Sequence, residues 1–281
     1  MMTKRLQHIS DNNFMLLYNK YKLLALNLFE WNGLPDEVKA HHIEKALYSY
    51  GACCLTEEHG GYIVLGCTES GEMNVMSEPI SYIASGYGYT KKVNVKNTPI
   101  CLNNDLRLST HIYVQEYARK MNEVEKSINA NIKQQKFPWL ITTTKNNEFS
   151  MKNLYNKIEN GEPIIYGTKD IDADSIKAFS TNTPYVVDKL NEYRFELERE
   201  ILTFFGLNNN FEKKERLLVD EVNSNNEFIT ANVDVMLKCR EDFCTEVNNR
   251  LGLNISVKKK YGNIEEDGGE ECQDTQLNLE R

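Results

Sequence analysis

The sequence lacks the local motifs by which nucleotide-using and hydrolytic enzymes are recognised. Neither GxxxxGK[ST] nor GxGxxG occurs in its 281 residues, so neither kind of phosphate-binding loop is present. The glycine pairs near Gly60 and Gly86 are therefore interpreted as turns between short strands. No Ser–His–Asp or Cys–His grouping has a recognised local signature. These absences argue against an enzyme, and no cofactor is predicted.

Paired cysteines and long apolar runs are also missing. Seven cysteines, an odd number without CxxC spacing, argue against a disulfide framework and against a zinc site. Neighbouring Cys53 and Cys54 would point to opposite faces of a strand, so no metal is predicted. Asn19, Lys20 and Lys22 interrupt the best candidate for a membrane span of ~18 residues, and no signal peptide is recognised. We expect a soluble protein that is made in the cytoplasm.

Excess basic charge is absent. The formal net charge is −8, and residues 265–281 contribute −6 of it, with seven acids against one base. This acidic tail has few apolar residues and is expected to be disordered. A basic stripe, typical of DNA-binding proteins that read sequence, is not found in the remaining, nearly neutral body.

Three long amphipathic helices dominate what is present. Apolar residues at spacings of three and four predict helices over residues 11–31, 109–137 and 184–205. Pro138 ends the second helix, and Pro184 is expected at the first position of the third. These helices are longer than a compact protein of this size requires. They suggest an elongated subunit that packs against copies of itself.

Shorter elements are predicted between these helices. Residues 51–102 are punctuated by glycines and rich in β-branched and aromatic residues, which predicts short strands in a small barrel or sandwich. Residues 139–180 read as mixed, with a strand at 139–144, a turn at 145–147, a helix over 150–158 and a strand at 163–167. Further helices are expected over 37–50 and 237–251, with a polar loop over 206–228, before a last strand at 253–261.

The third long helix carries a charged face opposite its apolar stripe. Its residues are Lys189, Glu192, Glu196, Arg199 and Glu200. In a monomer this would be an ordinary solvated face. In a ring with the face turned inward, each residue would become a belt of like charges. A mostly acidic wall with sparse lysines would hold duplex DNA loosely and let it slide.

Several segments of the chain resemble a known family. They are LFEW (28–31), SYIA (81–84), NND (103–105), LKCRE (237–241), LGLN (251–254) and the long block 183–222. With them the chain resembles the upper-collar, or head–tail connector, portal protein of small short-tailed Bacillus-type phages with protein-primed DNA replication.

The resemblance implies an α+β fold with long stem helices, an SH3-like β-barrel wing and a small α/β clip, assembling into a dodecameric portal ring. The implied domains are 1–50 (N-terminal arm and first stem and wing helices), 51–108 (SH3-like β-barrel wing), 109–137 (stem helix), 138–182 (α/β clip), 183–205 (channel-lining stem helix), 206–228 (tunnel loop), 229–264 (wing or crown helix and strand) and 265–281 (acidic disordered tail).

The resemblance also implies which lysines meet DNA. Lys189, and Lys213 and Lys214 of the tunnel loop, match channel lysines of the family. At a fourth lysine position this chain has Ser180, so that belt is missing or displaced to Lys177. Glu192, Glu196 and Arg199 complete the candidate channel residues.

The implied location is the capsid vertex of the virion, at the head–tail junction, after assembly in the host cytoplasm. The implied partners are further copies of the chain, sequence-independent duplex DNA, the major capsid and scaffold proteins, a separate packaging ATPase and the lower collar of the tail. Lys4 and Arg5 are candidates for a nucleic-acid contact of the N-terminal arm, such as a packaging RNA.

Two other readings remain open at this stage. A monomeric β-barrel could bind single-stranded nucleic acid through tyrosines and a basic groove over 51–102, where Lys91, Lys92 and Lys96 are clustered. The second alternative is an enzyme whose active site has no recognised sequence motif. A monomeric mass in solution would favour either of them over a ring.

Overall fold

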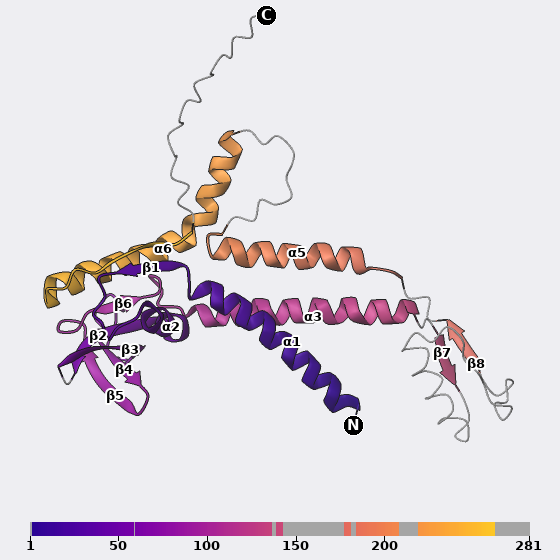
Figure 1. Cartoon of the computed structure of the whole chain (residues 1–281), viewed down its shortest axis with the longest axis horizontal. Helices are drawn as coiled ribbons and strands as arrows, with labels where there is room; N and C mark the ends of the chain where they lie inside the picture. Colours follow the sequence, from indigo (N-terminus) through magenta and orange to yellow (C-terminus); the bar gives the residue numbers. More distant parts are fainter. Residues whose placement is uncertain are drawn as a thin grey trace, which may run out of the picture. The chain divides into compact units, whose positions relative to one another are not determined.

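The computed structural model describes residues 2–58, 60–136, 139–142, 177–180, 184–207 and 219–261, with side chains over 12–58, 60–135, 184–207 and 231–261 (Figure 1). The chain forms two units: Met1–Lys120 with Leu197–Arg281, and Met121–Glu196. Helices α3, Thr110–Lys136, and α5, Val187–Phe204, each run through both units.

The first unit is built around an antiparallel sheet of five strands in the order β5-β4-β3-β2-β6. The strands are β2 (Ala52–Glu58), β3 (Gly61–Glu69), β4 (Ser81–Gly86), β5 (Tyr89–Asn94) and β6 (Ile100–Leu102). Helix α2, Ala40–Tyr50, packs on β2 and β3. One face of the sheet buries a small apolar cluster made of Ala52, Cys54, Leu65, Cys67, Tyr82, Ala84 and Val93.

These strands confirm the short, glycine-separated strands predicted over 51–102. Buried residues at four consecutive positions of β2 mean that both of its faces are covered, as in the centre of a layered fold. The recorded order places β5 and β6 at opposite ends of the sheet. Closure into a barrel therefore stays a prediction.

The first helix differs from its predicted bounds. Helix α1 covers Met2–Ala25, and the last predicted turns are instead strand β1, Phe29–Asn32. Nothing in the sequence before residue 11 breaks a helix, so α1 begins earlier than predicted. It ends earlier because β1 pairs with the distant strand β9, Ser256–Lys259, which buries Phe29 and Trp31. Pairing with a strand more than 220 residues away in the sequence thus overrides the helical spacing of the apolar residues at the end of the predicted helix.

The third long helix, in contrast, begins later than predicted. Pro184, Tyr185 and Val186 precede α5 instead of forming its first turn. The Asn131 side chain explains this, because its Nδ2 donates to the Pro184 carbonyl at 2.9 Å and its Oδ1 accepts from the Val186 N–H at 3.2 Å. At the other end, Gly206 adopts φ 67° and stops the helix, as predicted.

The last helix is longer than predicted. Helix α6 covers Val219–Leu251, so the final ten residues of the predicted 206–228 loop are helical. That stretch contains no glycine or proline, so nothing ends the helix as it extends toward its N-terminus. The α6 helix packs on β6 and β9 (Figure 1).

The second unit contains a small antiparallel pair of strands. Strand β7, Trp139–Thr142, pairs with β8, Lys177–Ser180, with Trp139 opposite Ser180. The first of these strands was predicted and the second was not. The helix predicted over 150–158 and the strand at 163–167 lie outside the described residues.

Replacing Gly51 with alanine is expected to destabilise the first unit by about 2–4 kcal/mol. Gly51 ends α2 at φ 80°, and a Cβ there would lie 2.0 Å from the Arg107 carbonyl oxygen. Gly88→Ala is the matched control, because Gly88 also has positive φ but no atom within 4 Å of its added Cβ. Urea unfolding should show a clearly smaller loss for Gly88→Ala, and equal losses would contradict the close-contact argument.

Candidate functional site

The charged face of α5 is exposed, as the sequence predicts. Lys189, Glu192, Glu196, Arg199 and Glu200 all lie on the solvent side of the helix. The opposite side buries Val187, Leu197, Ile201 and Phe205. From Lys189 to Arg199 the face rises by roughly 15 Å at ~1.5 Å per residue. Its charges therefore form a row along the helix axis, with two cations and three acids in the order Lys, Glu, Glu, Arg, Glu.

The two ends of α5 are held by different contacts. Within the 121–196 unit, Asn131 of α3 fixes the residues just before α5, as described above. Within the other unit, the Phe204 ring stacks on Tyr113 of α3 with a centroid distance of 4.7 Å. There the Lys20 ammonium of α1 also pairs with Glu198 at 2.6 Å. These contacts fix the rotation of the helix and hence the direction of its charged face.

Glu200 also affects a neighbouring tyrosine. Burial, together with the negative charge of Glu200, raises the pKa of the Tyr117 hydroxyl above its ordinary value. Glu200 differs in this respect from Glu192 and Glu196, which lie further along the exposed face.

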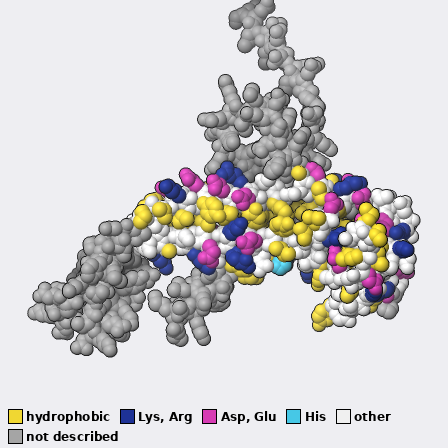
Figure 2. Space-filling model, turned by 180° about the vertical axis from the view of Figure 1, so that it is seen from behind, with side chains coloured by type: hydrophobic (Ala, Val, Ile, Leu, Met, Phe, Trp, Pro, Cys, Tyr) yellow, Lys and Arg dark blue, Asp and Glu magenta, His cyan; other side chains and the backbone are white. Residues whose placement is uncertain are grey.

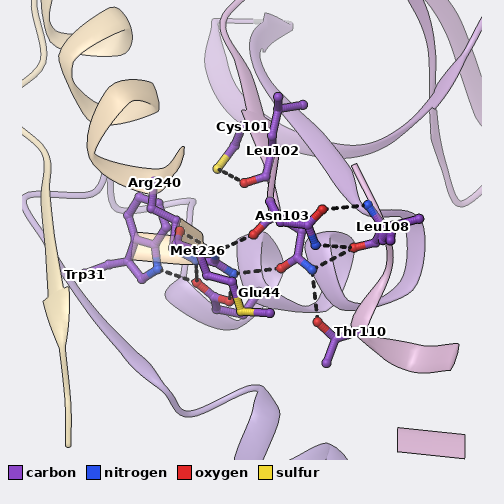
Figure 3. Close-up of polar contacts among 10 residues, drawn as sticks. Trp31, Glu44, Cys101, Leu102, Asn103, Leu108, Thr110, Met236 and Arg240 are labelled. Atoms are coloured by element: carbon purple, nitrogen blue, oxygen red, sulfur yellow. Dashed lines mark hydrogen bonds and ion pairs between the residues drawn. The ribbon is translucent and has the colours of Figure 1, made fainter. Parts of the chain in front are cut away.

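A buried ion pair ties α6 to α2 (Figure 3). The Arg240 guanidinium donates to both carboxylate oxygens of Glu44, from Nε at 2.9 Å and from Nη2 at 2.7 Å. The two side chains are 2% and 3% exposed. Trp31 Nε1 donates to the same carboxylate at 2.9 Å, and the guanidinium lies 4.1 Å from the Phe29 ring centroid.

Asn103 extends this network to the start of α3. Its Oδ1 accepts from Arg240 Nη2 at 3.2 Å, and its Nδ2 donates to Thr110 Oγ1 at 3.0 Å. Burial by itself lowers the pKa of the Arg240 guanidinium, but the Glu44 charge raises it above its ordinary value. The network thus joins four elements around a permanent charge pair.

Sequence reasoning missed these residues, although a signal was present. Glu44 lies between buried Ile43 and Leu47 on α2, and Arg240 lies between buried Met236 and Phe243 on α6. A charged residue in the apolar stripe of a helix predicts a buried partner of opposite sign. Two such stripes, one with an acid and one with a base, could have suggested the pair.

The other candidate residues are less completely placed. Lys213 and Lys214 lie outside the described residues. Lys177 lies in β8, and Lys4 and Arg5 lie in α1, where the backbone is described. The structure therefore leaves their proposed contacts as predictions.

The basic groove required by the single-strand alternative is largely neutralised. Lys91 pairs with Glu58 at 2.6 Å, and Lys92 pairs with Glu72. Among the described residues, no group of three or more His, Cys, Asp or Glu side chains could hold a metal ion. Within the same part of the chain, no helix has the length and apolar character to cross a membrane.

Hydrophobic side chains remain on the surface of the long helices. On the face shown in Figure 2, a band of hydrophobic side chains is bordered by Lys, Arg, Asp and Glu. Exposed apolar residues on the long helices, or just before α5, include Leu16, Leu23, Ile112, Ile132, Tyr185, Tyr193 and Phe195. A single chain therefore leaves apolar surface on α1 and α3 uncovered, as well as on and just before α5.

Comparisons with known proteins agree on one family. A family model described as Phage Connector (GP10) matches residues 2–264. The portal protein of Staphylococcus phage 44AHJD is 30% identical over 167 residues, which is 58% of this chain and 64% of that protein. The chain thus matches somewhat less than two thirds of the length of this curated relative.

A solved portal structure shares the fold. An HK97 family phage portal protein from Corynebacterium diphtheriae superposes with a TM-score of 0.50 and 11% identity, over 86% of this chain and 91% of that one. A chain from the portal and tail of native bacteriophage P68 is 18% identical, with a TM-score of 0.48, over 93% of this chain and 91% of that one. Because the family model spans nearly the whole sequence, the chain belongs to the phage connector family, the portal proteins of phage particles.

Proposed function

We propose that this chain forms the ring-shaped DNA channel at one vertex of a phage capsid, through which the genome is packaged, retained and ejected. The family match over residues 2–264 carries this proposal. The exposed apolar residues of α1 and α3, and those on and just before α5, support it, because a ring of copies would bury them. The resemblance suggests twelve subunits, an SH3-like barrel over 51–108 and a clip over 138–182.

The channel we infer acts passively and is not an enzyme. Packed helices make a stiff tube, and Glu192 and Glu196 form an acidic wall that keeps phosphates from adhering. Lys189, Lys213, Lys214 and, if displaced there, Lys177 supply sparse cations that slow backward movement of DNA. A separate packaging ATPase would drive DNA inward, while capsid, scaffold and lower-collar proteins would bind the outside of the ring.

Native mass measurement and negative-stain imaging at moderate salt test the ring directly. Closed rings with an open centre are the expected result. A stable monomer at high protein concentration would overturn the proposal and return attention to the β-sheet unit.

Replacing both Lys213 and Lys214 with alanine is expected to leave ring assembly intact but reduce the fraction of particles that retain full-length DNA severalfold. The physical reason is the loss of two phosphate contacts per subunit. Nuclease-protected DNA length in purified particles is the measurement. Lys91→Ala with Lys92→Ala is the matched control, since these adjacent lysines already pair with acids. Normal retention in the Lys213/Lys214 variant would refute the retention role.

A further inference from the structure

Two half-exposed aromatic side chains lie on opposite sides of the acidic face of α5. Glu192 and Glu196, one helical turn apart, define the direction of this face. At ~100° per residue, Tyr193 lies roughly 80° to one side of that direction and Phe195 roughly 80° to the other. Tyr193 is 46% exposed and Phe195 45%. The packing of a single chain therefore leaves both aromatic side chains partly uncovered.

Charged residues lie on the same two sides of the helix. In chain order, one side carries an acid, an aromatic residue and a base: Asp188, Phe195 and Arg199. The other side carries a base, an aromatic residue and an acid: Lys189, Tyr193 and Glu200. Every one of these charged residues lies roughly 40–60° from the direction of the acidic face. At each level along the helix, the two sides therefore carry opposite charges.

The charges on these two sides are free to meet a partner. Asp188, Lys189 and Arg199 are exposed, and their side chains form no ion pair or hydrogen bond with the described part of the chain. Glu200 lies beside the Tyr117 hydroxyl and is also exposed. Unpaired charges next to a half-exposed aromatic residue are typical of a surface that binds another protein.

Ring symmetry brings the two sides together. In a closed ring of about twelve copies with the acidic face turned inward, each neighbouring α5 lies roughly 75° from the inward direction. This angle is close to the ~80° at which Tyr193 and Phe195 project. Equivalent residues of all copies lie at one level of a ring, so one side of each helix faces the other side of the next.

We propose that the α5 helices of neighbouring copies of this chain pack side by side, with Phe195 of one copy against Tyr193 of the next. The two sides differ, so the contact is head-to-tail, the type that closes into rings. Two contacts between opposite charges flank the aromatic pair: Asp188 with Lys189 of the next copy, and Arg199 with Glu200 of the next copy. The inference rests on the proposed ring and identifies one of its subunit contacts.

The aromatic pair is prepared for this contact. The Arg194 guanidinium lies 4.9 Å from the Phe195 ring centroid and restrains that ring within its own chain. A restrained ring loses less entropy when a second aromatic side chain packs against it. Lys189 lies roughly 40° from the inward direction, so its long side chain can reach Asp188 of the next copy and still border the channel.

Cysteine cross-linking tests the aromatic contact. In a background with Cys239→Ser and Cys272→Ser, Tyr193→Cys/Phe195→Cys should give a ladder of linked copies up to the full ring under mild oxidation. The two positions lie on opposite sides of one helix, so they do not link within a chain. A mixture of the two single variants should give linked dimers only. The matched control, Glu192→Cys/Glu196→Cys, points into the proposed channel and should not link.

A charge exchange gives an independent readout. Lys189→Glu places two acids opposite each other and should raise the concentration needed for half-assembly about fivefold or more. The new acid lies in the first turn of α5, where it does not destabilise the helix, so the monomer melting temperature should not fall. Asp188→Lys/Lys189→Glu exchanges the two charges and should restore assembly. A double variant that assembles no better than Lys189→Glu would overturn the charge contact.

The outcomes separate this contact from the ring itself. Rings without links between positions 193 and 195 would overturn the contact and leave the ring standing. Dimers of the Phe195→Cys variant alone would show a two-fold contact and overturn the head-to-tail one. Links in the Glu192→Cys/Glu196→Cys control would turn the acidic face toward a neighbour, which also contradicts the proposal. A wild-type monomer would overturn both the contact and the ring.

Discussion

Replacing Arg240 with alanine is expected to lower the free energy of unfolding by about 3–5 kcal/mol. The change leaves the Glu44 carboxylate buried at 3% exposure without its counter-charge. It also removes donors to Asn103 and to the Met236 carbonyl, which accepts from Arg240 Nη1 at 2.9 Å. Because the pair joins α2 to α6, the docking of α6 on the sheet should weaken first.

Urea unfolding followed by tryptophan fluorescence is a suitable measurement, because Trp31 donates to Glu44 and would report the loss. We expect the midpoint to fall by about 1 M or more. Lys238→Ala is the control on the same helix, since its ion pair with Asp242 is exposed and should leave the midpoint nearly unchanged. A similar midpoint for both variants would show that the buried pair adds no net stability.

A second variant separates the loss of a charge pair from the loss of packing. Glu44→Leu/Arg240→Met removes both charges and keeps much of the apolar volume. It should be more stable than Arg240→Ala, because no unpaired charge remains buried. If the double variant is the less stable of the two, packing around Arg240, including the Phe29 ring, explains the effect instead.

The elements that sequence predicts well are those fixed by local signals. The apolar spacing of α3 and the proline after it set that helix to Thr110–Lys136, close to the predicted 109–137. Glycine-punctuated runs likewise predict the strands of the sheet. In both cases the apolar periodicity, and the proline or glycine that ends the element, lie within the element or directly beside it.

Features set by distant partners could not be predicted in this way. Strand β1 exists because β9 pairs with it, and α5 starts late because Asn131 binds the residues before it. The Glu44–Arg240 pair joins residues 196 positions apart. The exposed charged face of α5 is predictable, because it needs only the helix period. Whether that face meets DNA depends on neighbouring copies, which one sequence does not specify.

Replacing Glu192 and Glu196 with lysine is expected to make the proposed channel wall bind DNA tightly, so that DNA no longer slides along it. The five charged residues of the α5 face carry one net negative charge, and the double change adds four positive units per subunit. Repeated around a ring, this would create a strong polycation facing the DNA backbone. We expect affinity for a short duplex at about 50 mM salt to rise at least tenfold, with a steeper loss as salt increases.

Fluorescence anisotropy of a labelled duplex over a salt series measures both quantities. The matched control is Glu116→Lys/Glu123→Lys, which changes charge equally on exposed positions of α3 where the acids pair with Arg119 and Lys126. If the α3 variant binds DNA as tightly as the α5 variant, net charge explains the result and α5 does not line the channel. If the α5 variant alone binds tightly, particles carrying it should stall during packaging, because the DNA must then break many phosphate contacts at each step. The acidic residues of α5 would in that case be functional: they keep the wall non-adhesive, so that the sparse lysines can resist backward slippage without blocking movement.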